Sequence, residues 1–250
     1  MADTAIITGA SRGIGAATAE HLHHVGYNVV LVARSKDAID ALAKKLGERA
    51  RAVTCDVADF NSVNAAVSQT VSEFGSIDLV VNNAGLIDPI ARIEDSDPQA
   101  WSKFVDVNLK GVYNCVRAAI PHMKSGGGGT IINISSGAAT SALEGWSHYC
   151  ASKAAVLMLT RMIAKEESEN SIRAVGLSPG TVATDMQVAI KSSGINPVSK
   201  LDPSAHIPPE WVAKAIRWLA EGSAEARAFD GGDFSLKNDK GRTLVGLPPV

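Results

Sequence analysis

Short runs of apolar, β-branched residues alternate along this chain with longer segments whose apolar positions recur at helical spacing. The short runs lack the polar alternation of a half-exposed strand, so they are typical of parallel strands covered on both faces. We predict strands at residues 4–8, 28–33, 51–54, 78–81, 130–134 and 172–177, and helices at 13–25, 36–46, 60–74, 98–124 and 148–169. This alternation predicts an α/β, Rossmann-like, doubly wound parallel sheet.

The alternation breaks past residue 180. Residues 183–208 contain Pro197, Pro203 and Pro208 and show neither a clear strand nor a buried helix. A long segment of this kind is more often a functional lid than part of the scaffold, so we predict a substrate lid at about 183–208. A helix at 209–221 and a last strand near 229–236 are expected to follow. Because no linker or repeat divides the chain, residues 1–250 are predicted to form a single domain.

The composition argues against several classes of protein, namely nucleic-acid-binding, membrane and secreted proteins. The chain has 24 Lys and Arg residues against 26 Asp and Glu, so it lacks the basic excess of a nucleic-acid-binding protein. No uncharged apolar run approaches membrane-spanning length, and no secretory signal is visible. Cys55, Cys115 and Cys150 are far apart without a CxxC pair, which favours free thiols in a reducing compartment. We therefore expect a cytoplasmic protein that binds neither nucleic acid nor membrane.

A glycine-rich turn follows the first predicted strand, where residues 8–15 read TGASRGIG. Glycines permit a tight turn and let backbone N–H groups approach a pyrophosphate, to which the helix N-terminus adds partial positive charge. The spacing is GxxxGxG rather than GxGxxG, and a tight connection without a ligand is the alternative interpretation. The position between strand and helix favours a dinucleotide site.

The end of the second strand indicates which dinucleotide. An NAD site commonly places an Asp or Glu there for the ribose 2′-hydroxyl, whereas an Arg accommodates a 2′-phosphate. Here Ala33 is followed by Arg34, and Arg12 in the glycine turn is a second cation. Either arginine alone is compatible with an ordinary solvated residue. Together, with the acid absent, they favour NADP(H).

Tyr149 and Lys153 are one helical turn apart at the start of the fifth predicted helix, so both lie on one helix face. An ammonium near a phenol stabilises the phenolate, so we expect Lys153 to lower the pKa of Tyr149 and make it a general acid/base. Ser136 follows the fifth strand at the carboxyl edge of the sheet, where open α/β sheets bind ligands. Its hydroxyl is placed to polarise a substrate oxygen.

These motifs together resemble the short-chain dehydrogenase/reductase family. The glycine turn, Asn82-Asn83-Ala84-Gly85, Asn108, Ser136, the Tyr149/Lys153 pair and Pro179-Gly180 occur in order over nearly the whole chain. The resemblance implies four catalytic residues: Asn108, Ser136, Tyr149 and Lys153. With the two arginines above, it implies a cofactor site made of Gly9, Ser11, Arg12, Gly13, Ile14, Gly15, Arg34, Asp56, Val57, Asn82, Ala84, Gly85, Tyr149, Lys153, Pro179, Gly180, Val182 and Thr184.

The resemblance also implies roles for these residues. Tyr149 would be the acid/base, Lys153 would also hold the nicotinamide ribose, and Ser136 would orient the substrate carbonyl. Asn108 would hold a water that links Lys153 to solvent. Asp56 and the Val57 backbone would contact the adenine; a helix N-cap is the alternative role of Asp56. Residues of the nicotinamide end and the pyrophosphate site would be Ile14, Val182 and Thr184.

The substrate is less well indicated. The candidate pocket residues Leu86, Leu143, Trp146 and Met186 are apolar and include no Arg or Lys, so a small dianion is not expected. Residues 184–187 and 232–236 resemble the sepiapterin and benzil reductase branch. We predict reduction of a ketone, aldehyde or diketone, or oxidation of the alcohol, with NADP(H). The alternatives are a 3-oxoacyl-carrier-protein reductase, for which Arg117, Lys124 and Arg161 make a scattered docking patch, and a non-catalytic NADP-sensing protein.

Two further expectations concern metals and assembly. His21, His23 and His24 have no Cys or carboxylate partners at ligand spacing, and His148 should turn away from Tyr149, so no metal is expected. The helices at 98–124 and 148–169 carry more apolar positions than one sheet face needs, and in the related family they form a dimer contact. We predict a homodimer or homotetramer. The positions are Val112, Val116, Ile120, Val156, Leu159 and Met162.

Overall fold

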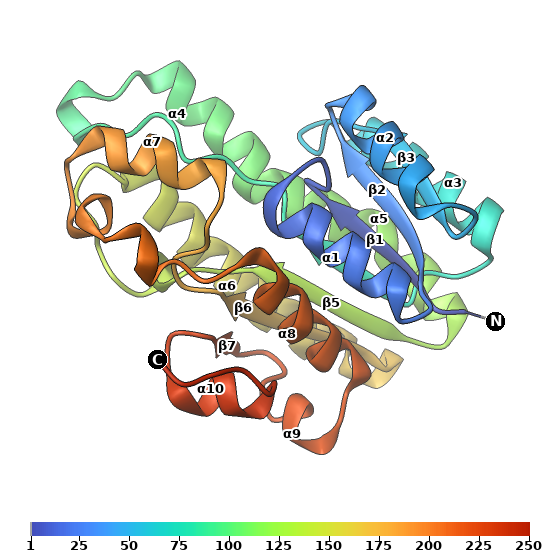
Figure 1. The fold of residues 1–250 in the computed structure, drawn as a ribbon. Coiled ribbons are helices and arrows are strands. Elements are labelled where there is room, and N and C mark those ends of the chain that lie inside the picture. Colours follow the sequence, from blue (N-terminus) through green and yellow to red (C-terminus); the bar gives the residue numbers. More distant parts are fainter. Residues whose placement is uncertain (1) are drawn as a thin grey trace.

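A parallel sheet runs through the centre of the computed structural model, which describes residues 2–250. Within that range seven strands pair in the order β3-β2-β1-β4-β5-β6-β7, and helices cover both faces (Figure 1). Every pairing between neighbouring strands is parallel, which confirms the predicted doubly wound α/β class. The strands are β1 Thr4–Thr8, β2 Asn28–Ala33, β3 Ala50–Thr54, β4 Leu79–Asn82, β5 Gly129–Ile134, β6 Ile172–Ser178 and β7 Asp233–Ser235.

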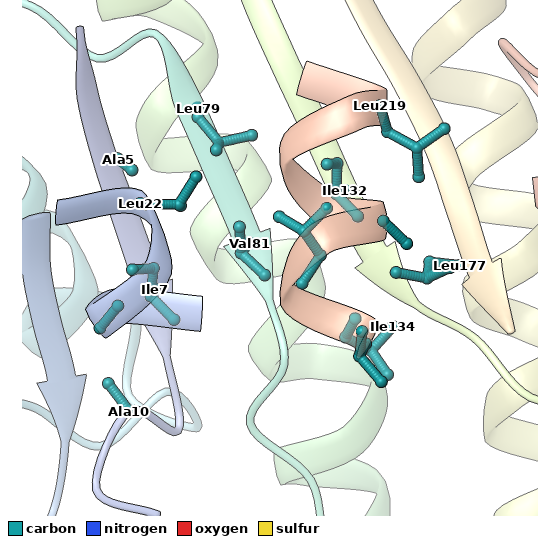
Figure 2. Close-up of a cluster of buried hydrophobic side chains, with 14 of the residues drawn as sticks. Ala5, Ile7, Ala10, Leu22, Leu79, Val81, Ile132, Ile134, Leu177 and Leu219 are labelled. Carbon is teal, nitrogen blue, oxygen red and sulfur yellow. The ribbon is translucent and has the colours of Figure 1, made fainter. Parts of the chain in front are cut away.

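Two apolar layers result from the alternation of side chains along the buried strands. On β1, Ile7 packs with α1 (Gly13–His24), α2 (Lys36–Leu46) and α8 (Pro209–Glu221), as Figure 2 shows for part of this cluster. Its neighbour Ile6 packs on the opposite face, beneath α3 (Phe60–Phe74), α5 (Gly111–Gly126) and α6 (Ser147–Glu167). Burial on both faces explains why these strands show no polar alternation.

The predicted helix at 98–124 is present, but it contains a wide turn that the sequence did not indicate. The segment forms α4 (Pro98–Val105), a π-helical turn at Asp106–Lys110 and then α5. Asn108 lies in the wide turn, where its Oδ1 accepts from the Leu86 amide at 2.8 Å and its Nδ2 donates to the Leu86 carbonyl at 3.1 Å. Apolar spacing differs too little between α and π turns for the sequence to reveal this one. Such turns are frequent at functional sites.

The segment at 183–208 contains more regular structure than expected. It includes the helix α7 (Asp185–Ser193) and two 3-10 turns at Pro197–Lys200 and Pro203–Ala205. Ile190 of α7 is buried against Ile87 and Trp146, beyond the carboxyl ends of the strands (Figure 1). With one buried residue, α7 has too weak an apolar stripe to be recognised in the sequence. The role of this segment as a lid stays a prediction.

The C-terminal part joins the sheet through a buried ion pair. α8 has the predicted bounds, but the last strand, β7, is shorter than 229–236 and lies between α9 (Ala224–Arg227) and α10 (Asp239–Leu244). The Arg173 guanidinium of β6 contacts both carboxylate oxygens of Asp230, at 2.9 and 3.0 Å. It also donates to the Leu219 carbonyl at 2.9 Å. Only 8% of the Arg173 side chain is exposed, so its charge depends on these partners.

This ion pair leads to a stability prediction. Replacing Asp230 by Ala should lower the free energy of unfolding by roughly 2–4 kcal/mol, because it leaves a largely buried guanidinium without its counter-charge. Denaturant titration followed by circular dichroism measures the change. As a matched control, Glu221→Ala breaks the exposed Arg217–Glu221 pair and should cost less than about 1 kcal/mol. Equal losses for the two variants would contradict the assignment.

Candidate active site

The glycine turn between β1 and α1 closes tightly on itself. Gly9 and Gly13 have φ angles of +67° and +57°, and a Cβ at Gly15 would collide with the Gly9 carbonyl oxygen. Asn83, which follows β4, donates from Nδ2 to the carbonyls of Thr8 and Gly9, at 2.9 and 3.3 Å. Each glycine is therefore required by backbone geometry.

The turn has the properties of a phosphate site. Within residues 2–250, α1 begins without a side-chain cap and without an acid in its first turn. Its first amide N–H groups are thus available to an anion, and the helix dipole favours one. Thr184 reaches this site, since its Cγ2 lies 3.1 Å from the position of a Cβ at Gly13. The residues present therefore fit the pyrophosphate of a dinucleotide.

The two predicted arginines occupy different surroundings. Arg34 is exposed directly after the buried Ala33. Arg12 instead pairs with Asp185 at the start of α7, with an N–O distance of 3.0 Å. Both side chains of this pair are more than two-thirds exposed, at 76% and 70%, so the pair contributes little and a phosphate can replace it.

Several predicted cofactor residues have structural partners. Asp56 accepts from the Ala58 amide at 3.0 Å, whereas the N-cap of α3 is Asp59, so the alternative role of Asp56 as the helix cap is wrong. The Val57 carbonyl accepts from Asn114 at 2.8 Å. Asn82 points into the sheet and donates to Asn133 Oδ1 at 2.8 Å. Ala84 and Gly85 pack against Gly9 and Asn108, respectively, and Val182 bridges to Ile207.

The catalytic candidates converge at the carboxyl end of β5. Tyr149 and Lys153 lie on the first turns of α6, and the Lys153 Nζ is 5.6 Å from the centre of the Tyr149 ring. Nζ donates to the Ile134 carbonyl at 2.6 Å, at the last residue of β5. The Ser136 side chain is close enough to the Tyr149 hydroxyl to favour its ionised form. Ser136, Tyr149 and the buried Lys153 ammonium therefore gather at the end of one strand.

Burial governs the titration of this pair. It raises the pKa of Tyr149, and the hydrogen bond with Ser136 partly opposes the rise. It lowers the pKa of Lys153 to about 8, opposed by the negative charge of Asp233. The prediction that Lys153 lowers the pKa of Tyr149 stays a prediction, and in this structure desolvation has the largest effect on the phenol and raises its pKa.

Asp233 is a residue that the sequence did not single out. It lies on β7 opposite Gly176 of β6, and a Cβ on that glycine would be 2.7 Å from its Oδ1. Its Oδ2 accepts from the Ser178 hydroxyl at 2.6 Å, and burial raises the pKa of its carboxyl group. Its nearness to Lys153 depends on the packing of β7 beside β6. Nothing local in the sequence indicates that contact.

Three of the four residues predicted to line a pocket near Tyr149 pack together. Leu143, Trp146 and Met186 belong to one cluster with Tyr149, and the Trp146 and Tyr149 ring centres are 5.2 Å apart. Leu86 is an exception, because it packs in the cluster beneath α5 and α6.

His148 is buried against Phe104, with Nε2 2.7 Å from the Ile87 carbonyl, so it is turned away from the site as predicted. Across residues 2–250 no group of three or more His, Cys, Asp or Glu side chains is arranged to bind a metal. No helix in that range is long and apolar enough to cross a bilayer.

A family model described as short chain dehydrogenase matches residues 3–194, which include all four catalytic candidates. The chain belongs to this family. It is therefore an oxidoreductase that acts on CH–OH or C=O groups, and the family uses NAD(P)(H). Enzymes of the family typically act on small molecules as oligomers.

Relatives and solved structures agree with this assignment. The chain is 38% identical over 196 residues to the 3-oxoacyl-(acyl-carrier-protein) reductase FabG of Staphylococcus aureus, covering 76% of this chain and 78% of that one. It is 36% identical over 236 residues to cis-4-hydroxycyclohexanecarboxylate dehydrogenase of Sinomonas cyclohexanicum, covering 91% and 95%. These relatives do not support the predicted sepiapterin and benzil reductase branch.

Two solved structures share the fold. The crystal structure of the KRED1-Pglu enzyme matches with a TM-score of 0.86 and 32% identity, covering 92% of this chain and 99% of that one. That of 3-ketoacyl-(acyl-carrier-protein) reductase from Brucella melitensis, complexed with NADH, matches with a TM-score of 0.82 and 30% identity, covering 94% and 96%.

The surroundings of Lys153 generate a prediction on pH. Lys153 is charged below its pKa of about 8, so activity that needs the ammonium should be retained below that pH and lost above it. Asp233→Asn removes a negative charge that favours the ammonium, so the basic limb of kcat/KM should move to lower pH. Glu210→Gln, an exposed change on α8, should leave the profile unchanged. An unmoved basic limb in the Asp233 variant would contradict the electrostatic link.

Proposed function

We propose that this protein reduces a ketone, aldehyde or diketone carbonyl with NADPH, or oxidises the corresponding alcohol with NADP⁺. The observation that carries the proposal is the grouping of Ser136, Tyr149 and the buried ammonium of Lys153 at the carboxyl end of β5, where Lys153 Nζ donates to the Ile134 carbonyl and lies 5.6 Å from the centre of the Tyr149 ring. Two neighbouring hydroxyls suit a carbonyl oxygen, which accepts two hydrogen bonds. The glycine turn beside them suits the phosphates of the cofactor.

Side chains of the protein would transfer the proton and orient the substrate. The bound cofactor would supply or accept the hydride. Ser136 would donate a hydrogen bond that fixes and polarises the carbonyl oxygen. Tyr149 would donate its proton to that oxygen during reduction and take it back during oxidation. Lys153 would stabilise the resulting phenolate, and Asn108 in the wide turn would hold a water that links Lys153 to solvent.

The strongest alternative is a 3-oxoacyl-carrier-protein reductase. The likeness to the Staphylococcus aureus and Brucella melitensis enzymes favours it. A basic docking surface for the acidic carrier has little support, because the Lys124 ammonium is already paired with Glu167 at 2.7 Å. The relative from Sinomonas cyclohexanicum covers more of the chain and is named for a small alcohol that carries a carboxylate. This coverage favours a small-molecule substrate.

The predictions on a sensor role, on oligomeric state and on localisation remain proposals. A non-catalytic NADP sensor is disfavoured because all four catalytic groups are present. For a homodimer or homotetramer, Val112, Val116 and Val156 are buried in the core and do not argue for a partner, contrary to expectation. The support comes from Met162, a predicted position that is exposed, and from two further exposed apolar side chains on α5 and α6, Tyr113 and Met158. Cytoplasmic localisation stays an expectation.

Mutation of Tyr149 tests the proposed function directly. Tyr149→Phe should lower kcat by about 10²–10⁴-fold while the affinity for NADPH stays nearly unchanged, because only the proton donor is lost. The assay follows NADPH absorbance with a panel of ketones, aldehydes, 1,2-diketones and an acetoacetyl carrier protein. Tyr27→Phe, on the loop between α1 and β2, is the matched control and should keep its activity. A Tyr149→Phe variant that keeps half of the original kcat would contradict the proposal.

Arg34 should determine the choice of cofactor. A guanidinium binds a 2′-phosphate through charge-assisted hydrogen bonds, so Arg34→Ala should weaken NADPH by about tenfold or more and NADH much less. Adding Ala33→Asp should reverse the preference by repelling the phosphate and binding the ribose hydroxyl. The measurement is kcat/KM with both cofactors. Lys44→Ala, an exposed lysine of α2, is the charge-matched control. Equal losses with both cofactors would refute the role of Arg34.

A further inference from the structure

Lys237 lies across two glycines at the carboxyl edge of the sheet. It follows β7, and its Cγ is 3.1 Å from the position of a Cβ at Gly180. Its Nζ is 3.3 Å from the position of a Cβ at Gly137. Gly137 directly follows Ser136, and Gly180 has a φ of +81°. The side chain therefore runs from the Pro-Gly turn after β6 towards the residue next to the candidate hydroxyl.

Gly180 is needed for this arrangement. A side chain there would crowd the stem of Lys237, and its left-handed φ is a second reason for glycine at that position. At Gly137 a Cβ would meet only the flexible end of the lysine. The ammonium therefore lies near the residue that follows Ser136, without a charged partner among residues 2–250.

The charge of Lys237 is available to a ligand. Among residues 2–250 its Nζ has no carboxylate within 4.0 Å and no hydrogen-bond partner. The nearest acid along the chain, Asp239, accepts from the Val250 amide at 2.7 Å, and Asp233 accepts from the Ser178 hydroxyl and faces Gly176. Lys237 is exposed to solvent, whereas the cluster around Tyr149 is apolar and includes Leu143 and Trp146. Lys237 is thus a cation outside the four predicted pocket residues, and it lies beside Gly137.

We propose that Lys237 is a specificity-determining residue that binds a carboxylate on the substrate, so that the preferred substrates are oxo acids or the matching hydroxy acids. The inference rests on the proposed function, because Ser136 and Tyr149 must hold the carbonyl while Lys237 holds the anion. A single ammonium without a guanidinium fork suits a monoanion better than a phosphate dianion. The carboxylate would lie a few bonds from the reacting carbon, with the intervening carbons on the apolar wall.

The size of the effect follows from the exposure of the lysine. Exposed ion pairs are weak, and hydrogen bonds to charged groups in partly closed sites are stronger. An ammonium at the rim of an apolar pocket falls between these limits. We expect a preference of about three- to tenfold in kcat/KM for an anion over its neutral ester.

The test compares acids with their methyl esters. The substrates are 4-oxopentanoate, 5-oxohexanoate and their methyl esters, assayed with NADPH at low and high salt. The original enzyme should favour at least one acid over its ester, and salt should reduce that preference. In Lys237→Met the ratio of acid to ester should fall to about one, and in Lys237→Glu the ester should be favoured. Lys240→Met, an exposed lysine of α10, is matched in residue type and should keep the original ratio.

A binding measurement separates this inference from the proposed function. Calorimetry on the NADP⁺-loaded protein compares pentanoate with pentanamide, neither of which can react. Tighter binding of pentanoate that is lost in Lys237→Met supports the anion site even if none of the ketones is reduced, an outcome that would count against the proposed function alone. Conversely, turnover of esters with an acid-to-ester ratio that Lys237→Met leaves unchanged, or equal binding of pentanoate and pentanamide, overturns the role of Lys237.

Discussion

A buried ammonium joins α6 to the end of β5, and the geometry of the candidate site depends on it. Lys153 is 8% exposed and donates to the Ile134 carbonyl at 2.6 Å. That carbonyl belongs to the last residue of the strand, immediately before Ser135 and Ser136. The hydrogen bond thus fixes the first turns of α6, and with them Tyr149, relative to Ser136. Desolvation of the charge costs free energy, and the carbonyl dipole and the nearby carboxylate of Asp233 offset part of that cost.

The order of the strands brings the phosphate turn to the same place. β1 lies between β2 and β4, so the chain leaves β1 and β4 in different directions at the switch point of the sheet. Asn83 crosses this point and holds the carbonyls of Thr8 and Gly9. The turn that suits a pyrophosphate follows β1, and the residues that suit a carbonyl gather at the end of β5; these two strands lie on either side of β4 in one sheet. A cofactor bound at the first would reach the second without any large rearrangement of the sheet.

The sequence was sufficient wherever the signal is local. The strands could be predicted because burial on both faces leaves an unbroken apolar run, and the spacing of Tyr149 and Lys153 places them together in any helix. The π turn around Asn108 could not, because its stabilising contact is with Leu86, far away in the sequence. The direction of the Tyr149 pKa could not either, since it depends on how much solvent the fold removes. Asp233 was missed because its neighbours come from strands that pair only in the folded sheet.

The part of the chain that matches the family model and the part beyond it both contribute residues to the same edge of the sheet. The family model ends at residue 194, after every catalytic candidate, whereas Asp233 and Lys237 lie beyond it. Both reach the site from the β7 edge, and both do so over glycines: Gly176 admits the carboxylate, and Gly137 and Gly180 admit the lysine. Where the backbone carries a glycine, a charged side chain from a neighbouring segment can approach closely without any shift of the backbone. The charge beside a fixed carbonyl-binding centre can therefore change through the C-terminal segment alone, while the hydroxyls of Ser136 and Tyr149 and the ammonium of Lys153 keep their positions.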